Sequence, residues 1–109
     1  MMIKIFEGLL EVEQTWLEFW AAGFEYPTTI VADRYGGCYS NAAYLAFPVD
    51  FYKLPKDIDG GDIECMEIWK KANNDVIGKG ATPGQALKDL RKKLKPYKEA
   101  GQKQFGEVD

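Results

Sequence analysis

The residues best suited to contact a ligand form the short stretch Asp33-Arg34-Tyr35-Gly36-Gly37. An arginine guanidinium can fork onto a phosphate group, and a tyrosine ring can stack on a base. The stretch therefore predicts a site for a nucleotide-like anion, with Arg34, Tyr35, Gly36 and Gly37 as the ligand-binding residues. The alternative, which we favour, is hairpin chemistry, because turns commonly use glycine to reach positive φ.

Catalytic chemistry is poorly represented in the chain. Histidine is absent, and Cys38 and Cys65 do not form a Cys-x-x-Cys pair, so the commonest general base and the Cys-His nucleophile pair are missing. The spacing Asp57-x-Asp59-x-x-Asp62 resembles part of a calcium loop but lacks the closing glutamate. We therefore expect reduced thiols, no catalytic residue, no metal and no cofactor. An enzyme that uses a cysteine or a pair of carboxylates is the disfavoured alternative.

Charge is divided unevenly along the chain. Residues 1–69 contain 4 basic and 12 acidic side chains, whereas residues 70–109 contain 10 basic and 5 acidic ones, so the two parts have net charges of −8 and +5. Such a division can steer the approach of a charged partner. If the protein binds nucleic acid, the basic residues that would contact phosphates are Lys88, Arg91, Lys92 and Lys95. We favour a solvated helix face for them.

The acidic part contains the residues that we predict to contact a protein partner. Tryptophan is common in binding hot spots, and a row of carboxylates can imitate phosphates and occupy a basic groove. The alternatives are that the tryptophans belong to the core and that the carboxylates are only solvated. A homodimer interface would also cover the large tryptophan area. The predicted partner-binding residues are Glu11, Trp16, Glu18, Trp20, Asp59 and Asp62.

Hydrophobic periodicity predicts the elements that would hold these residues. Residues 9–22 show helical spacing, and Gly23 would end that helix. Residues 28–32 are rich in β-branched side chains and predict a strand, which the turn at 33–37 would join to a second strand at 38–47. The apolar face of the first helix would consist of Leu9, Val12, Trp16, Phe19 and Trp20.

The second half of the chain predicts two more helices and one more strand. Residues 49–54 lie between two prolines and would form a short edge strand or an ordered loop. Asp62 would cap a helix over residues 63–72, and residues 76–80 would form a strand. Thr82-Pro83-Gly84-Gln85 has the order of a capping box, so the last helix would begin there and stop at Pro96. The buried faces would be Ile63, Met66 and Trp69 in one helix, and Ala86, Leu87, Leu90 and Leu94 in the other.

The expected fold is α+β, with a small antiparallel sheet of three to four strands packed against helices. Of the 109 residues, 46% are hydrophobic, which suffices for one core without disulfides or metals. We expect a single compact domain over residues 1–96 and a polar tail over residues 97–109. The chain has neither a long apolar run nor a signal-peptide pattern, so we expect a cytoplasmic protein that does not contact membranes.

Two motifs together resemble the HicB antitoxin family. The first is the Asp-x-x-Gly-Gly-x-Tyr turn that leads into Leu45-Ala46-Phe47-Pro48, and the second is the stretch from Ile77 to Leu90, whose most specific part is Gly80 to Leu90. The resemblance covers roughly residues 28–94. It implies a small β-sheet packed on one helix, to which this chain adds an N-terminal helix and an inserted helix within residues 49–74.

The same resemblance implies a role, because HicB-like antitoxins neutralise a small RNA-cleaving toxin by covering its surface. The chain also resembles small phage anti-defence proteins, including anti-CRISPR and antirestriction proteins, in its size and composition. Both likenesses predict a non-enzymatic inhibitor that masks a partner protein, in the host cytoplasm if a phage encodes it. The alternative function is binding or sequestering a small nucleotide-like anion. Nucleic-acid binding is less favoured than either.

Overall fold

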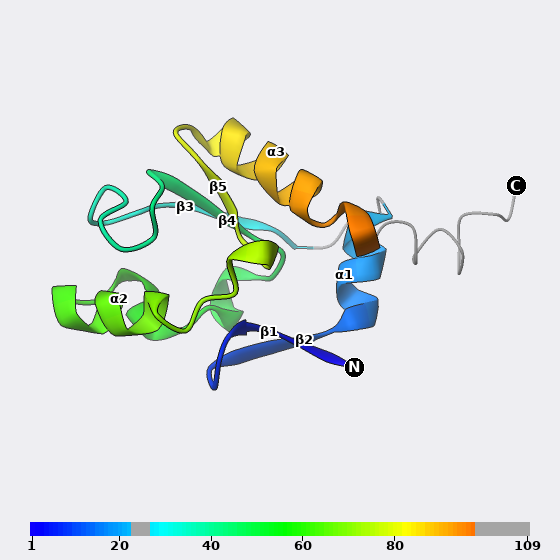
Figure 1. The fold of residues 1–109 in the computed structure, drawn as a ribbon, viewed down its shortest axis with the longest axis horizontal. Coiled ribbons are helices and arrows are strands. Elements are labelled where there is room, and N and C mark those ends of the chain that lie inside the picture. Colours follow the sequence, from blue (N-terminus) through cyan, green and yellow to red (C-terminus); the bar gives the residue numbers. More distant parts are fainter. Residues whose placement is uncertain (23–26, 98–109) are drawn as a thin grey trace, which may run out of the picture.

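The computed structural model describes residues 1–22 and 27–97, which form an α+β domain with two antiparallel sheets (Figure 1). The predicted helix end at Gly23, together with residues 98–109 of the predicted tail, lies outside the described residues. In the described part, no helix has the length and apolar character needed to cross a membrane. The elements are β1 (Met2–Phe6), β2 (Leu10–Glu13), α1 (Gln14–Ala21), β3 (Thr29–Ala32), β4 (Tyr44–Phe47), the 3-10 helix η1 (Phe51–Lys53), the 3-10 helix η2 (Lys56–Asp59), α2 (Asp62–Trp69), the 3-10 helix η3 (Asn74–Val76), β5 (Gly78–Gly80) and α3 (Pro83–Lys93).

The N-terminal segment differs from the prediction of one long helix, because residues 2–13 form the β1–β2 hairpin. Leu10 and Val12 are buried and alternate with exposed glutamates, which is the period of a strand. β1 supplies the pairing partner, with Ile3 opposite Val12. Gly8 forms the turn at a φ of 77°. The helix α1 therefore starts at Gln14, and the predicted start near Leu9 is wrong.

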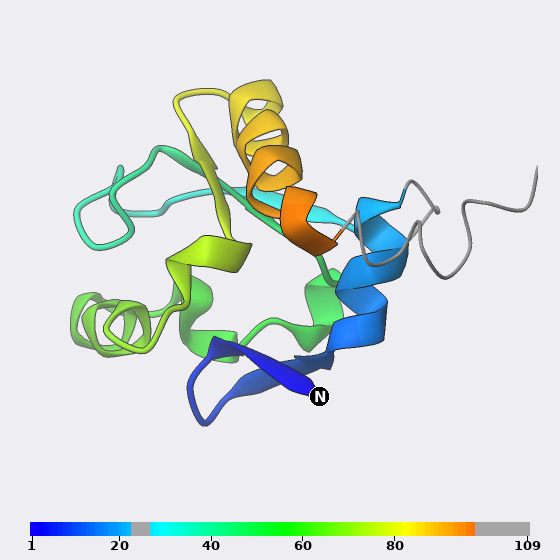
Figure 2. The same cartoon turned by 45° about the vertical axis from the view of Figure 1, so that its right-hand side comes forward.

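The three-stranded sheet has the order β3-β4-β5 and two faces of different character. Ala46 lies opposite Gly78, and Tyr44 lies opposite Gly80, on the face that α3 covers. On the other side of the sheet lie α2 and the β1–β2 hairpin, which both views show (Figures 1 and 2). The domain is thus layered, with the sheet between α3 and the N-terminal hairpin.

An aromatic cluster joins the layers in the core. The Phe6 ring of β1 lies 5.4 Å from the Trp69 ring of α2 and 6.0 Å from the Phe47 ring of β4. Backbone hydrogen bonds add to this contact: the Asn73 amide donates to the Ile5 carbonyl at 2.8 Å. The hairpin is therefore held both by side-chain packing and by the segment that follows α2.

Three predictions about the middle of the chain can be compared with the structure, and two of them need correction. The predicted strand at 38–47 is β only from Tyr44, because the chain turns through Gly36, Gly37 and Asn41 at positive φ. Residues 49–54 contain the 3-10 helix η1 and no strand, so the ordered loop is the predicted alternative that the structure has. The helix predicted at 63–72 is α2, in which Asp62 is the first helical residue and not the cap.

The buried face of α2 also differs from the prediction. The predicted burial of Ile63 is wrong, because its side chain is 70% exposed. Cys65, Ile68 and Trp69 form the buried face instead. The predicted face therefore holds only for Trp69, with Met66 half-buried.

The α3 prediction is confirmed at its start. The Thr82 hydroxyl accepts a hydrogen bond from the Gln85 amide at 3.2 Å, and the Gln85 side chain accepts one from the Ala81 amide at 3.0 Å. Ala86 and Leu90 lie on the buried face of α3, whereas Leu87 is half-buried. The bond from Gln85 satisfies a backbone N–H group that a helix start leaves unpaired, and the bond from Ala81 holds the residue before the cap. The predicted stop at Pro96 is wrong, because α3 ends at Lys93 and residues 95–97 form a further helical turn that includes Pro96.

The contact between α3 and β5 can be tested with two alanine substitutions. A Cβ added at Gly78 would lie 2.2 Å from the Ala86 carbonyl oxygen, whereas one at Gly84 would meet nothing within 4 Å. Gly78→Ala should lower the free energy of unfolding by about 3 kcal/mol. Gly84→Ala, on the exposed first turn, should be neutral or raise it by about 0.5 kcal/mol. Urea denaturation measures both, and equal midpoints for Gly78→Ala and the wild type would contradict this packing.

Candidate functional site

The Arg34-Tyr35 turn contacts the segment that precedes α2. The Arg34 guanidinium donates to the carbonyls of Asp59 at 3.2 Å and Gly60 at 3.1 Å, and the Tyr35 hydroxyl donates to the Gly60 carbonyl at 3.0 Å. The guanidinium carbon also lies 5.5 Å from the Tyr35 ring centroid. An Asp33 carboxylate oxygen accepts from the Tyr35 amide at 2.7 Å and fixes the turn. Both side chains therefore hold the turn against the segment that precedes α2.

A second set of contacts orders loop 33–43 and links it to the start of α2 through Tyr39. The Tyr39 hydroxyl donates to the Asp62 carboxylate, and the Ser40 hydroxyl donates to the Asp33 carboxylate. The hydrogen bond to Asp62 raises the pKa of Tyr39 to about 12, with smaller contributions from desolvation and from the negative charge of Asp62. The Tyr39 ring meets the Tyr35 ring edge-on at 5.7 Å. Loop 33–43 is thereby tied to the start of α2.

The four residues predicted to bind a nucleotide-like anion are separated into two pairs. Arg34 and Tyr35 are directed at the Asp59–Gly60 backbone, whereas Gly36 and Gly37 line a pocket against β5. The positive φ of both glycines, 66° and 98°, agrees with the hairpin interpretation of the turn. The structure does not assemble these residues into one ligand cradle.

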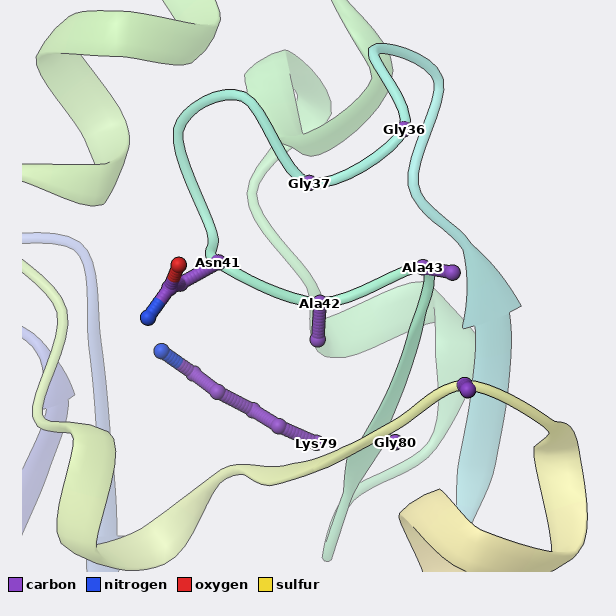
Figure 3. Close-up of a pocket in the computed structure, with 8 residues that line it drawn as sticks. Gly36, Gly37, Asn41, Ala42, Ala43, Lys79 and Gly80 are labelled. Atoms are coloured by element: carbon purple, nitrogen blue, oxygen red, sulfur yellow. The ribbon is translucent and has the colours of Figure 1, made fainter.

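The pocket beside these glycines has a volume of about 450 Å³ and a largely backbone wall. Figure 3 shows the Lys79 side chain of β5 and the Asn41 side chain of loop 33–43 pointing toward one another across it. We call it the glycine–lysine pocket. It is lined by Gly36, Gly37, Asn41, Ala42, Ala43, Lys79, Gly80 and Ala81.

Lys79 carries the only charged side chain among the residues that line this pocket. Its ammonium group lies 5.7 Å from the Trp69 ring centroid, and burial, followed by the nearby positive charge of Lys93, lowers its pKa. The Asp89 carboxylate opposes that shift, but it pairs with Lys93 at 3.0 Å and accepts from the Lys79 backbone amide at 2.9 Å. Lys79 is thus a partly desolvated cation that faces a hollow.

Sequence reasoning did not identify Lys79 or Asn41 as site residues. A signal for Lys79 exists, because the alternation of a strand places it on the face opposite Gly78 and Gly80. Nothing in the sequence alone brings Asn41 to it, since they meet only when loop 33–43 folds along β5 (Figure 3).

A second pocket, of about 430 Å³, lies between the end of β3 and the η1–η2 segment. Two aromatic side chains stand at it: Phe51 is 59% exposed and Tyr52 is 91% exposed, with ring centroids 5.9 Å apart. Sequence reasoning did not single them out, although a Phe-Tyr pair between two prolines was a usable signal. We call this second cavity the Phe51–Tyr52 pocket. It is lined by Val31, Ala32, Asp33, Leu45, Phe51, Tyr52, Leu54, Pro55, Lys56, Ile58 and Asp59.

The two tryptophans predicted to bind a partner are half-buried and anchor α1 to the rest of the domain. The Trp16 indole donates to the Pro48 carbonyl at 2.6 Å, and the Trp20 indole donates to the Thr28 hydroxyl at 2.6 Å. Glu18 is only 9% exposed and accepts from the Gln14 amide group at 3.0 Å. These contacts favour a structural interpretation for all three side chains.

The six predicted partner-binding residues do not form one surface. Glu11 is exposed on β2, next to α1, whereas Asp59 is exposed at the end of η2 and Asp62 at the start of α2. In both views α1 and α2 lie at opposite sides of the domain (Figures 1 and 2). Of these six residues, only Asp59 lines the Phe51–Tyr52 pocket.

The four basic residues predicted to contact nucleic acid are all exposed. Lys88, Arg91, Lys92 and Lys95 follow the helical spacing of one face, and the first three belong to α3. The structure therefore leaves these cations together on the outer side of the domain.

The two cysteines differ in environment, and both are free thiols. Cys65 is buried under η2 and its pKa is raised by burial, whereas Cys38 is exposed in loop 33–43. Within residues 1–22 and 27–97, no group of three or more histidine, cysteine or acidic side chains is arranged to hold a metal ion.

The Tyr39–Asp62 contact predicts a specific pH dependence. The folded-state pKa of Tyr39 is raised above its usual value of 10.0, so the contact stabilises the fold below about pH 10 and this contribution is lost as the pH rises toward 12. In the wild type, NMR of the tyrosine rings should show one ring that titrates near 12. Asp62→Ala should return it toward 10, and Asp57→Ala should leave it unchanged. A Tyr39 ring that already titrates near 10 in the wild type would show that the hydrogen bond is not formed.

Comparisons with known proteins found no protein similar to this chain. No protein-family model matches the chain, and neither the curated proteins nor the solved structures include a match to it. The HicB-like interpretation therefore stays a prediction.

Proposed function

We propose that this protein acts by binding a partner protein and covering part of the partner's working surface, as in toxin neutralisation or phage anti-defence. The observation that carries the proposal is the exposed pair Phe51 and Tyr52 beside an apolar pocket. Exposed aromatic side chains next to a pocket are typical of protein-binding surfaces, where such residues supply most of the binding energy.

The backbone under this aromatic pair is held in place. The Asp50 carboxylate accepts from the Tyr52 amide at 3.3 Å, and the Asp50 carbonyl accepts from the Lys53 amide at 3.0 Å. Leu54 follows and is buried in the core. Because the turn is already ordered, little conformational entropy is lost when the rings contact a partner. The inserted segment 49–74 thus serves both as scaffold and, in this proposal, as recognition surface.

Charge around the pocket favours a partner with a basic rim. Asp33 and Asp59 line it, with Lys56 as the only cation in the lining, and Asp57 and Asp62 are exposed nearby in sequence. Carboxylates at the edge of an interface mainly raise the association rate and select the partner. The fit is to an apolar side chain in the pocket surrounded by lysine or arginine. A small RNA-cleaving toxin or a nucleic-acid-binding defence component would present such a surface.

The proposal predicts that binding depends on the two rings. The full-length protein, tagged at one end, is used to capture proteins from lysate of the source cells, or of the bacterial host if the source is a phage. Phe51→Ser and Tyr52→Ser should each weaken retention of one specific protein by about thirtyfold, since hot-spot truncations cost about 2 kcal/mol. Leu9→Ser is the matched control, because Leu9 is a 51% exposed apolar residue of the β1–β2 turn that does not line the pocket.

The captured protein must then lose its own activity when this protein is added. The expected titration is linear and reaches its minimum at one equivalent, as steric masking requires. Equal retention of that protein by the wild type and both serine variants would remove the Phe51–Tyr52 pocket from the mechanism. Retention of nucleic acid alone, lost at high salt, would contradict the proposal and transfer the function to the basic face of α3.

A further inference from the structure

We propose that the glycine–lysine pocket binds a small, non-aromatic ligand through a phosphate or carboxylate group that contacts Lys79. This site is separate from the surface proposed above, because the two pockets share no lining residue. The result for one site therefore leaves the other unaffected.

The charge of the pocket selects an anion. No acidic residue lines it, and no carboxylate in the described part of the chain lies within ion-pair distance of the Lys79 ammonium group. The neighbouring acid, Asp89, is already paired with Lys93. Partial burial of a cation without an ion-pair partner is unfavourable, and an incoming anion would relieve this cost. The lowered pKa of Lys79 agrees with that description.

The walls allow close approach to this cation. Gly36, Gly37 and Gly80 present backbone without side chains, and Ala42 adds only a methyl group (Figure 3). At Gly36 an added Cβ would meet nothing within 4 Å, so the backbone there is open to a ligand, whereas at Gly37 and Gly80 an added Cβ would meet Ala42 and α3 instead. The Asn41 amide, across the pocket from Lys79, supplies both a donor and an acceptor for further polar atoms of the ligand.

The lining also limits the ligand class. About 450 Å³ lies within the usual range for small-molecule pockets. None of the lining residues is aromatic, so a nucleobase would find no ring on which to stack. Lysine binds phosphate and carboxylate alike as a point charge. The proposed ligand therefore carries one or the other of these anionic groups.

The test is a titration of the full-length, isotope-labelled protein followed by backbone amide NMR. Inorganic phosphate and acetate are added in separate experiments at constant ionic strength and pH. We expect saturable shifts at Gly36, Gly37, Asn41 and Gly80. Saturation with phosphate alone assigns a phosphate ligand, saturation with acetate alone assigns a carboxylate, and saturation with both assigns the shared anionic group.

Three variants make the test specific. Lys79→Met removes the charge at similar side-chain length and should weaken binding about tenfold or more. Asn41→Asp keeps Lys79 but places a carboxylate opposite it, and should also abolish saturation. Lys88→Met removes an exposed lysine from α3 and should change nothing. Because Asn41→Asp leaves Lys79 over Trp69, the test remains decisive if Lys79→Met fails to fold.

Several results would overturn the proposal. Shifts that grow linearly with both anions, or saturable shifts confined to the basic face of α3, would show only non-specific attraction. Undiminished binding by a folded Lys79→Met variant, or by Asn41→Asp, would place the anion elsewhere.

Discussion

The close approach of α3 to β5 is the constraint on which the rest of the structure depends. Any side chain at Gly78 or Gly80 would collide with the backbone of α3 near Ala86, so β5 has glycine on that face. Lys79, between them, is the only side chain that β5 presents, and strand geometry directs it away from α3 toward Trp69. One packing requirement therefore shapes the core and also leaves a cation beside a bare backbone wall.

Short sequence patterns predicted those elements whose start or end is determined by hydrogen bonds between residues close in the chain. Thr82 and Gln85 mark the start of α3, and their hydrogen bonds lie within a few residues of each other. The N-terminal hairpin was missed because Leu9, Val12 and Trp16 also fit a helical period. Pairing with β1 decides between the two periods, and the final anchor, the contact of Phe6 with Trp69, comes from a distant part of the chain. Tertiary contacts of this kind override local preference.

The candidate sites were less predictable than the fold, because they too depend on contacts between residues far apart in the chain. Arg34 and Tyr35 have the chemistry of a ligand site, but the carbonyls they contact lie about 25 residues later in the chain. Their role follows from where η2 ends, which no local pattern specifies. Conversely, Phe51 and Tyr52 look like core residues by type. They are exposed because η1 directs the buried positions to Val49 and Leu54 on either side of them.

The unequal burial of the two thiols has a practical consequence. Cys65 is enclosed by the core and its thiolate is disfavoured, whereas Cys38 stands exposed directly after Gly37. Alkylating reagents attack accessible thiolates, so a maleimide dye should modify one position of the native chain without any engineering. That position lies in loop 33–43, between the fastened Arg34-Tyr35 turn and the wall of the glycine–lysine pocket. The native chain thus contains its own attachment point for a fluorescent reporter of events on that loop.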